Sequence, residues 1–323
     1  MKLLTPGPVE LHPRVLQAMA KQVISHRSEA FRSLLVDIIE KLGEVYRTRS
    51  GYIALLTGSG TLAVNAMVYN IVNPGDKVLL LTFGEFGDRL LDALHTRGAL
   101  VDVVMRNYGD AVRLHDVEEL LERNGYKALF TVYVETSTGA MLKDLELIAR
   151  KAKENNMLVC VDAVSALGGE PLEMDKWCLD VVASCSQKCI GAPPGLSFVA
   201  LSEDALEAME HVKRPPQYMD LKRYIRFLER RCETPYTPAV NILYGLNEAL
   251  DMLLEEGVEN RWLRFRRLSS TVYREAEKLG LKGFPKADVR ADTLVALKVP
   301  DGVSALEILR KLEEHEFKVA QGI

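Results

Sequence analysis

Short apolar segments alternate with longer amphipathic segments between about residues 50 and 200. Segments that are apolar at nearly every position are typical of strands buried on both faces, as in parallel sheets covered by helices. Seven such strands are predicted, at residues 52–57, 78–83, 100–105, 128–134, 158–162, 181–184 and 196–201. Helices are predicted between several of them, at 61–71, 87–96, 116–123 and 144–155. The pattern therefore predicts an α/β fold with a mostly parallel sheet of about seven strands.

The pattern changes after residue 240. Apolar positions at helical spacing predict a long helix at 241–256, and a second, strongly basic helix is predicted at 261–279. Further along, 292–299 alternates like a strand, 304–314 has the pattern of a helix, and 317–320 begins another strand. We therefore expect an N-terminal arm at 1–20, a large domain at 21–240 and a small α+β domain at 241–323. The chain is expected to stop inside this small domain.

Composition limits the partners that we expect. The 323 residues include 41 Lys and Arg against 45 Asp and Glu, a net charge of −4. This balance leaves no basic excess for a nucleic-acid backbone and argues against nucleic acid as the main partner. No long apolar stretch predicts a membrane-spanning helix. The five cysteines lack the spacing of a zinc site or a CxxC pair, so we expect no metal and the reduced thiols of a cytoplasmic protein.

Ligands of an open parallel sheet bind at the carboxyl ends of its strands. The loop Thr57-Gly58-Ser59-Gly60-Thr61 lies at such an end, where free amides at the start of the next helix favour a phosphate or carboxylate. An ordinary N-capped helix after a glycine turn explains the same residues. The chain has neither the GxGxxG pattern nor the P-loop lysine, so neither a dinucleotide site nor an ATP site is predicted.

Three further residues follow buried strands at this edge. Asp162 ends strand 158–162, where a buried anion needs a cation or several donors; a cap on the next turn is the simpler explanation. Lys188 lies between a buried strand and a loop rich in Gly and Pro. If it is desolvated there, its pKa falls and its neutral amine becomes a nucleophile for carbonyl groups; otherwise it is a solvated lysine. Phe86 either offers a flat face to an aromatic ligand or packs in the core.

Five short motifs occur along nearly the whole chain. They are Thr5-Pro6-Gly7-Pro8, Ser25-His26-Arg27-Ser28, Glu135-Thr136-Ser137-Thr138-Gly139, Val161-Asp162-Ala163-Val164-Ser165 and Ser186-Gln187-Lys188, the last followed by Pro193-Pro194-Gly195. In this order, and with Asp162 placed 26 positions before Lys188, they resemble class V aminotransferases of the pyridoxal 5′-phosphate (PLP) fold-type I group. The resemblance is strongest to the alanine–glyoxylate and serine–pyruvate aminotransferases.

The resemblance implies PLP as the cofactor and a role for each matching residue. Lys188 is expected to form the Schiff base with PLP and to move a proton between the substrate α-carbon and the cofactor. Asp162 is expected to keep the pyridine nitrogen protonated, which makes the ring an electron sink. The other residues expected at the cofactor are Ser59, Gly60, Thr61 and Gln187 at the phosphate, Phe86 on the ring where many relatives have Trp, and Ser137 near the substituted edge of the ring.

The segment Thr234-Pro235-Tyr236-Thr237-Pro238 implies an oligomer. Thr237 matches a threonine that, in this family, reaches the phosphate of the neighbouring subunit, so a homodimer with shared active sites is expected. Relatives often carry Tyr where Thr234 stands. Substrate choice is expected to depend on loops at 5–8, 26–32 and 214–236, with Arg223 and Arg226 solvated rather than catalytic.

The expected reaction is a ping-pong transamination from a small amino acid, alanine or serine, to a 2-oxo acid, glyoxylate or pyruvate. Relatives continue past Gln321-Gly322 into a segment whose arginine binds the substrate α-carboxylate, whereas this chain ends at Ile323. We therefore expect a fragment of a longer protein, or another cation in that role. The alternatives are another class V activity, such as cysteine desulfurase or lyase, and an inactive fold-type I scaffold.

Overall fold

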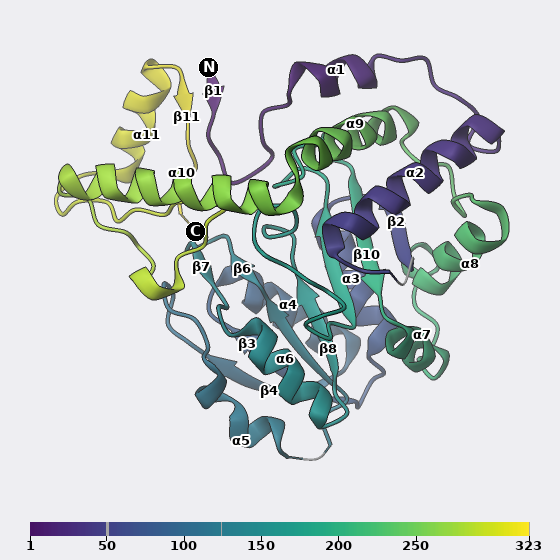
Figure 1. Ribbon diagram of the computed structural model, residues 1–323. Helices are drawn as coiled ribbons and strands as arrows, with labels where there is room; N and C mark the ends of the chain where they lie inside the picture. The colour runs from purple at the N-terminus through teal and green to yellow at the C-terminus, as the bar shows by residue number, and fades with distance from the viewer. Residues whose placement is uncertain (50–51, 124, 323) are drawn as a thin grey trace.

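The computed structural model describes residues 1–49, 52–123 and 125–322, and it places one large sheet between two layers of helices (Figure 1). The strands are β1 Lys2–Leu3, β2 Ile53–Thr57, β3 Lys77–Thr82, β4 Leu100–Met105, β5 Ala128–Val132, β6 Val134–Glu135, β7 Ala140–Met141, β8 Leu158–Asp162, β9 Val181–Cys185, β10 Leu196–Leu201 and β11 Phe317–Lys318. The α-helices are α1 Pro13–Met19, α2 Glu29–Tyr46, α3 Gly60–Ile71, α4 Glu85–Arg97, α5 Glu118–Leu121, α6 Leu145–Glu154, α7 Glu203–Glu210, α8 Leu221–Arg231, α9 Val240–Glu256, α10 Val258–Lys278 and α11 Ala305–Glu314. Three 3₁₀ turns, η1 Leu114–Asp116, η2 Gln217–Met219 and η3 Ala287–Val289, complete the elements.

The central sheet has seven strands in the order β2-β10-β9-β8-β5-β3-β4. β10 runs antiparallel to both of its neighbours, and all other neighbouring pairs are parallel. Each of the seven strands lies within two residues of its predicted position. The predicted α/β class and the mostly parallel sheet of seven strands are therefore confirmed.

Six of the seven strands are buried on both faces, which explains why they are apolar at nearly every position, whereas the edge strand β4 is largely exposed. In β3, Leu79 and Leu81 enter one core, while Val78 and Leu80 enter the core on the other face. The first core is covered by helices that include α2, α6 and α9, and the second by α3, α4, α7 and α8. The alternation of side chains along a strand thus fills two cores at once.

The C-terminal part departs from the sequence prediction at one element. The stretch 292–299 was predicted to be a strand, but within the described residues 125–322 it forms no strand and makes only an isolated bridge between Leu297 and Gly283. Two backbone hydrogen bonds join it to the same short segment, from Phe284 to Ala296 and from Lys298 to Lys282. The pairing goes no further, because the Ala296 amide donates to the Tyr273 hydroxyl and the Lys286 amide to the Gly109 carbonyl.

Other differences concern helices. The segment 214–236 was expected to be a loop, yet it holds α8, which Asp220 caps by accepting a hydrogen bond from the Arg223 amide. The predicted helix at 116–123 is divided into η1 and the single turn α5. The helices α1, α2 and α7 were not predicted. The two ends of the chain meet, because β1 pairs in parallel with β11 at the top of Figure 1.

A buried carboxylate joins the large sheet region to the C-terminal part. Glu170 is fully buried, and its Oε1 accepts hydrogen bonds from the amides of Asp292 and Thr293. Its Oε2 has no hydrogen-bond partner among the residues described. Burial, together with the nearby charge of Asp292, raises the pKa of Glu170 to about 7. An ionised Glu170 is therefore unfavourable in the folded state.

Glu170→Gln is expected to flatten the pH dependence of stability. A carboxyl whose folded pKa lies above its unfolded value destabilises the fold as pH rises from about 4 through 7, by roughly 3 kcal/mol for this shift. The variant, compared with wild type by urea unfolding of the cofactor-free protein at pH 5 and pH 8, should gain stability mainly at pH 8. Glu173→Gln, at a half-exposed site, should keep the wild-type slope; equal slopes for wild type and Glu170→Gln would contradict the prediction.

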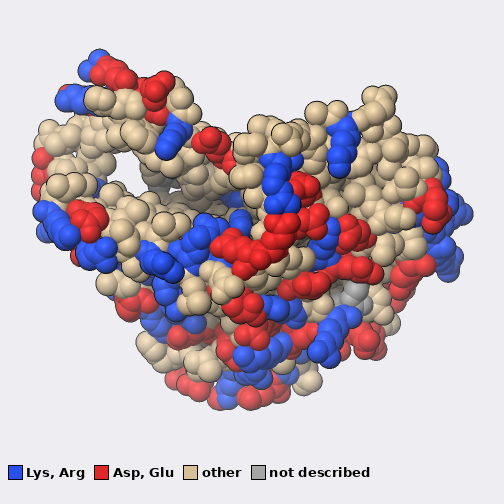
Figure 2. All heavy atoms as spheres, turned by 45° about the horizontal axis from the view of Figure 1, so that its top comes forward, with Lys and Arg blue, Asp and Glu red and all other residues tan. Residues whose placement is uncertain are grey.

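Figure 2 shows Lys and Arg side chains interleaved with Asp and Glu over the face that it displays. The surface is open beside the lobe that Figure 1 identifies as α11, β1 and β11. In the part of the chain that the structure describes, none of the helices combines the length and hydrophobicity that crossing a membrane requires.

Candidate active site

The register of the sheet gathers the predicted residues at one edge. The carboxyl ends of β5, β8 and β9 lie side by side, because Val132 pairs with Asp162, and Asp162 with Ala183. β10 starts at this edge, where Leu196 pairs with Thr57 at the end of β2 and the Gly58 amide donates to the Gly195 carbonyl. The loops after β2, β8 and β9 are therefore neighbours in space.

The loop after β2 forms an open cradle. Ser59 has the extended backbone of an N-cap residue, but its hydroxyl caps no amide of α3 and remains exposed, as does the Thr61 side chain. Gly60 is buried, and a Cβ at this position would lie 2.9 Å from Cγ2 of Val164. Backbone and hydroxyl donors at the start of a twelve-residue helix thus surround a space from which larger side chains are excluded.

Gln187 lies beside this cradle with an unsatisfied polar atom. Its Oε1 is buried and has no hydrogen-bond partner among the described residues. The oxygen and nitrogen of an amide exchange by a simple flip, so the same position can present an NH₂ donor to a phosphate. A buried amide without a partner is costly, and a ligand would satisfy it.

Asp162 is buried at the end of β8. Its Oδ1 accepts one hydrogen bond, from the Val164 amide at 2.9 Å. Burial raises the pKa of Asp162 to about 7; the Val164 amide and the charge of Lys188 oppose the shift, and the charge of Glu135 adds to it. The carboxyl therefore lacks the cation that would make its ionised form favourable. A protonated ring nitrogen is a partner of the required charge.

Lys188 lies on the loop after β9 under the N-terminal arm. Its Nζ donates a hydrogen bond to the Pro6 carbonyl at 2.8 Å. Gly7 is so close that a Cβ there would lie 2.6 Å from Cδ of Lys188 and 2.8 Å from its Nζ. Burial lowers the pKa of Lys188 below its ordinary value, which favours the neutral, nucleophilic amine. Of the two interpretations of Lys188, the structure supports the desolvated one.

Glu135 connects the residues on the third side of the site. Its Oε2 accepts the amides of Phe86 and Gly87 at the start of α4, at 3.1 and 3.2 Å. Its Oε1 accepts the Ser137 amide at 3.1 Å and the Ser137 hydroxyl at 2.5 Å. Burial raises the pKa of Glu135, whereas these four donors oppose the shift. One carboxylate therefore fixes both Phe86 and Ser137.

Phe86 packs in part against the core, as one of the two sequence interpretations expected. It is half-buried and packs against the core on the α3–α4 side of the sheet. The guanidinium of Arg89 lies 4.9 Å from the centre of its ring.

Glu135→Gln is expected to destabilise the fold by about 2 kcal/mol and to weaken PLP binding, because an amide has one acceptor oxygen and leaves one pair of donors unsatisfied. Urea unfolding measures the first effect, and titration of the cofactor-free protein with PLP measures the second. Ser137→Ala removes only the hydroxyl and should leave most of the stability in place. Wild-type PLP affinity in Glu135→Gln would show that the carboxylate does not organise the site.

Thr237 is exposed in the segment before α9. The segment is held against the cradle, because the Ala239 amide donates to Oγ1 of Thr57 at 3.2 Å. On its other side, buried Glu233 pairs with Arg27 at 2.6 Å and Arg32 at 2.8 Å, and Arg27 also donates to the Thr234 carbonyl. Arg27 thus holds this segment, while the His26 ring packs edge-on against Phe31.

Two cavities adjoin Lys188 and Ser137. One, of about 250 Å³, is lined by residues that include Lys188, Cys189 and Arg261. The other, of about 710 Å³, lies between the arm, Ser137 and the C-terminal segments near α11 and β11. Thr5, Pro6, Thr293 and Leu294 line both, so the arm separates two parts of one cleft.

Sequence reasoning missed two contributors to this region. Glu135 was recognised only as part of a motif, and no pattern in the sequence shows that its carboxylate would bind the start of α4. Arg261 was placed in a basic helix, yet it is turned inward, donating to the Cys189 carbonyl at 2.6 Å and pairing with Glu256 at 3.1 Å. The contacts of Glu135 with α4 and of Arg261 with Cys189 join residues that are far apart in the sequence.

The described residues fit PLP. The cradle of Ser59, Gly60 and Thr61 with the unsatisfied Gln187 Oε1 suits a phosphate. Asp162, which has no ion pair among the described residues, suits a protonated pyridine nitrogen, and the desolvated Lys188 amine suits an aldehyde. Three chemically different groups of the cofactor thus find a matching group at one edge of the sheet.

Comparisons with known proteins agree with this chemistry. The sequence model of the family described as aminotransferase class-V matches residues 3–323. An uncharacterised aminotransferase of Methanocaldococcus jannaschii is 40% identical over 306 residues, which cover 93% of this chain and 78% of that protein. A serine–glyoxylate aminotransferase of Arabidopsis thaliana is 32% identical, covering 96% of this chain and 78% of that protein.

A solved structure is similar over the whole fold. The crystal structure of an alanine–glyoxylate aminotransferase from Nostoc sp. superimposes with a TM-score of 0.95 at 34% identity, covering 99% of this chain and 86% of that one. The predicted family and the predicted cofactor, PLP, are therefore confirmed. The chain belongs to the class V aminotransferases, which are PLP-dependent transaminases acting on amino acids and 2-oxo acids.

Proposed function

We propose that the protein transfers the amino group of a small amino acid, alanine or serine, to glyoxylate or pyruvate by a ping-pong mechanism. The observation that carries this proposal is the desolvated amine of Lys188 at the sheet edge that also holds Asp162. The names of the similar serine–glyoxylate and alanine–glyoxylate aminotransferases support the choice of donors and acceptor.

Each residue has a defined task in this proposal. When bound, PLP supplies an aldehyde for amino groups and a ring that withdraws electrons from the substrate α-carbon. Lys188 holds the aldehyde between turnovers and moves the proton at the α-carbon. Asp162 holds a proton at the ring nitrogen. The remaining residues bind and orient: Ser59, Gly60, Thr61 and Gln187 at the phosphate, Phe86 on the ring face, and Ser137 at the substituted edge.

The proposal includes a homodimer with shared active sites. Thr237 is exposed, and its segment is held in place by Thr57 on one side and by the Arg27–Glu233–Arg32 cluster on the other. A fixed, exposed threonine is suited to donate to a phosphate of a second subunit. We also keep the division into an arm at 1–20, a large domain at 21–240 and a small domain at 241–323. A cytoplasmic location is supported by five cysteines that are all unpaired.

A panel of donors and acceptors tests the proposal. The complete open reading frame, loaded with PLP, would be assayed with alanine, serine, aspartate and cysteine against glyoxylate and pyruvate. We expect alanine or serine alone to change the visible absorbance of the bound cofactor, and the 2-oxo acid to restore it. An absorbance that survives saturating alanine and serine would refute the proposed donors.

The same panel separates the alternatives. Cysteine desulfurases require a nucleophilic cysteine, and Cys189 lines the cavity beside Lys188. Burial raises the pKa of Cys189 to about 12, so this sulfur is a thiol at neutral pH and a poor nucleophile. We therefore expect no sulfide from cysteine. Protein that never takes up PLP would instead favour an inactive scaffold.

Gly7→Ala is expected to lower kcat/KM about tenfold and, like its control, to lose roughly 1–2 kcal/mol of stability to backbone strain. Gly7 has a φ of +133°, which strains any other residue, and the new Cβ would push against the Lys188 side chain. Gly75→Ala is the matched control, since Gly75 has a φ of +88° but nothing lies within 4 Å of its Cβ position. If both variants lose activity equally, the contact between the arm and Lys188 has no part in turnover.

A further inference from the structure

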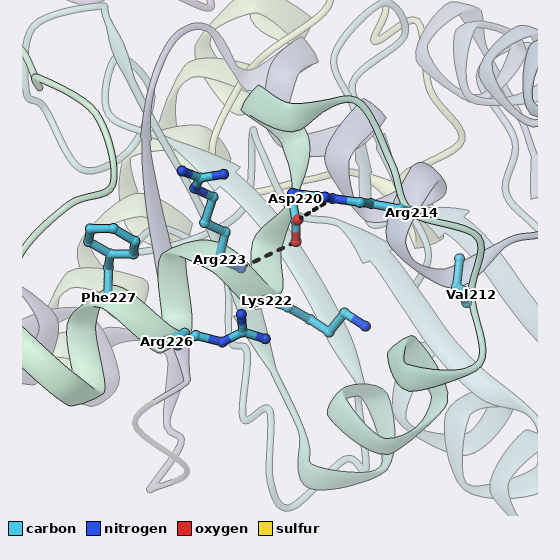
Figure 3. Close-up of a pocket in the computed structure, with 7 residues that line it drawn as sticks. All are labelled: Val212, Arg214, Asp220, Lys222, Arg223, Arg226 and Phe227. Atoms are coloured by element: carbon cyan, nitrogen blue, oxygen red, sulfur yellow. Dashed lines mark hydrogen bonds and ion pairs between the residues drawn. The ribbon is translucent and has the colours of Figure 1, made fainter.

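A basic groove lies between α8 and the segment that leads into it from α7 (Figure 3). The groove has a volume of about 450 Å³, and its lining includes Arg214, Lys222, Arg223 and Arg226 together with Asp220 and Phe227. In Figure 3, Arg223, Arg226 and Phe227 come from α8, and Arg214 reaches in from the preceding segment. Four cations thus face one carboxylate in a chain whose net charge is −4.

The single carboxylate is already engaged. Oδ1 of Asp220 accepts the Arg223 amide at 3.2 Å, and Oδ2 pairs with Arg214 at 3.4 Å (Figure 3). Lys222 has a carboxylate at 3.5 Å, that of Glu210. Over residues 1–49, 52–123 and 125–322, by contrast, no carboxylate lies within ion-pair distance of the guanidinium of Arg223 or Arg226. The positive charge of the groove is therefore not neutralised from within.

Arg223 is held in place without its hydrogen bonds being satisfied. Its guanidinium carbon lies 5.4 Å from the centre of the Tyr236 ring and 5.9 Å from that of Phe227. Its Nε is buried and has no partner in the described part of the chain. A guanidinium stacked on aromatic rings loses little further freedom when it binds an oxyanion.

The two arginines weaken the helix that carries them. Arg223 and Arg226 are three residues apart on α8, and like charges at this spacing destabilise a helix by a few tenths of a kcal/mol. Neither arginine gains an ion pair in return from the residues that the structure describes. Anionic groups bound at each arginine would offset the repulsion and satisfy the unused donors.

The groove is separated from the proposed phosphate cradle by an aromatic pair. The Tyr236 ring, which contacts Arg223, stacks on Tyr218 at 5.2 Å, and the Tyr218 hydroxyl donates to the Thr57 carbonyl at 2.9 Å. This aromatic pair therefore lies between the cations of the groove and the loop of Ser59, Gly60 and Thr61. The cradle needs none of them to hold its own phosphate.

We propose that this groove binds a small polyanion carrying at least two phosphate or carboxylate groups. In Figure 3, Arg223 and Arg214 lie on one side of the groove and Arg226 and Lys222 on the other, so each pair faces one group. The volume falls in the range of small-molecule sites, and guanidinium pairs bind planar or tetrahedral oxyanions with two hydrogen bonds each. An extended polymer is disfavoured because the cations are confined to a groove of about 450 Å³ and acidic side chains are interleaved with basic ones over the face shown in Figure 2.

Calorimetric titration of the PLP-loaded chain with inorganic pyrophosphate tests the proposal. Saturation with PLP keeps the probe out of the cradle, and catalysis is not required, so the result is independent of the proposed transamination. We expect one pyrophosphate per chain at roughly 0.15 M ionic strength, with affinity that falls as salt rises. Citrate in place of pyrophosphate shows whether the groove takes carboxylates as well as phosphates.

Arg223→Gln/Arg226→Gln should weaken pyrophosphate binding at least tenfold. Arg230→Gln/Arg267→Gln, which removes the same charge from exposed sites outside the groove, should change it less than twofold. Arg226→Gln alone, at an exposed position, provides a second variant if the double variant does not fold. Unchanged binding in both groove variants would overturn the proposal. A changed oligomeric state without an effect on pyrophosphate would also overturn it, by assigning the groove to a subunit contact.

Discussion

Lys188→Ala is expected to lower kcat/KM by more than about a thousandfold, because it removes both the covalent attachment of the cofactor and the base at the substrate α-carbon. PLP should still bind, since the phosphate cradle and Asp162 are untouched. The measurement is steady-state turnover, combined with borohydride reduction and mass analysis of the peptides. In wild type the reduced cofactor should be found on Lys188, and in the variant on no lysine.

Lys188→Arg tests whether the positive charge at position 188 is sufficient or whether a nucleophilic amine is required. A guanidinium keeps the positive charge near the Pro6 carbonyl, but it stays protonated and does not attack an aldehyde. This variant should be as inactive as Lys188→Ala while unfolding at a similar urea concentration. Substantial turnover by either variant, or a reduced cofactor on another lysine, would remove the central residue of the proposed mechanism.

The sheet was predictable because most of its strands are buried on both faces. β3 fills one core with Leu79 and Leu81 and the other with Val78 and Leu80, so the strand is almost continuously apolar and stands out in the sequence. Six of the seven strands lie where they were predicted for this reason; β4 is apolar and was predicted as well, although it is a largely exposed edge strand. The strand expected at 128–134 shows the limit: β5 ends at Val132, and Val134 belongs to the separate strand β6.

Alternation of apolar and polar residues predicted strands less reliably than a continuous apolar sequence did. The stretch 292–299 alternates in sequence but not in burial, since 292–296 are all partly buried and 297–299 are exposed, and among the described residues it pairs only with the short segment 282–284. A period of two in the sequence therefore does not show that a partner strand exists. α8 was missed for the opposite reason, since its many charges hide the buried residues Leu221, Tyr224 and Ile225.

The positions of the site residues followed from the strand order, whereas their environment did not. The carboxyl ends of parallel strands meet, so Asp162 and the loop of Ser59 could be expected at one edge. That Lys188 would lie under Pro6 and Gly7 depends on a contact between positions 182 residues apart. The Glu135 contacts to α4 and the buried Nε of Arg223, which has no hydrogen-bond partner among the described residues, are likewise products of tertiary packing, which no local pattern records.

Asp162→Asn is expected to lower kcat by roughly a hundred- to ten-thousandfold, the range for loss of a positioned proton-handling group. An amide fits the same space and can still accept the Val164 hydrogen bond, but it carries no charge and does not keep a ring nitrogen protonated. The ring then withdraws fewer electrons from the substrate, so the loss should appear in kcat rather than in the affinity for PLP. Single-turnover kinetics with alanine measure it directly.

The pH dependence of stability gives Asp162→Asn a second readout. Since burial raises the pKa of Asp162 to about 7, ionisation of this carboxyl destabilises the cofactor-free fold as pH rises from about 4 through 7. The variant lacks this titration and should gain stability at pH 8 relative to wild type. Bound PLP should reverse the comparison, because a protonated ring nitrogen stabilises the wild-type carboxylate and does nothing for the amide.

Asp180→Asn is the matched control for both readouts. Asp180 is also a buried carboxyl, but it precedes β9 at the opposite edge of the sheet, where it pairs with Lys153 at 2.9 Å and accepts the Val159 amide. Its loss should reduce stability while leaving the kcat of PLP-loaded protein near wild type. If Asp180→Asn lowers kcat as much as Asp162→Asn, the effect of Asp162 is one of general stability, and its proposed role at the ring nitrogen fails.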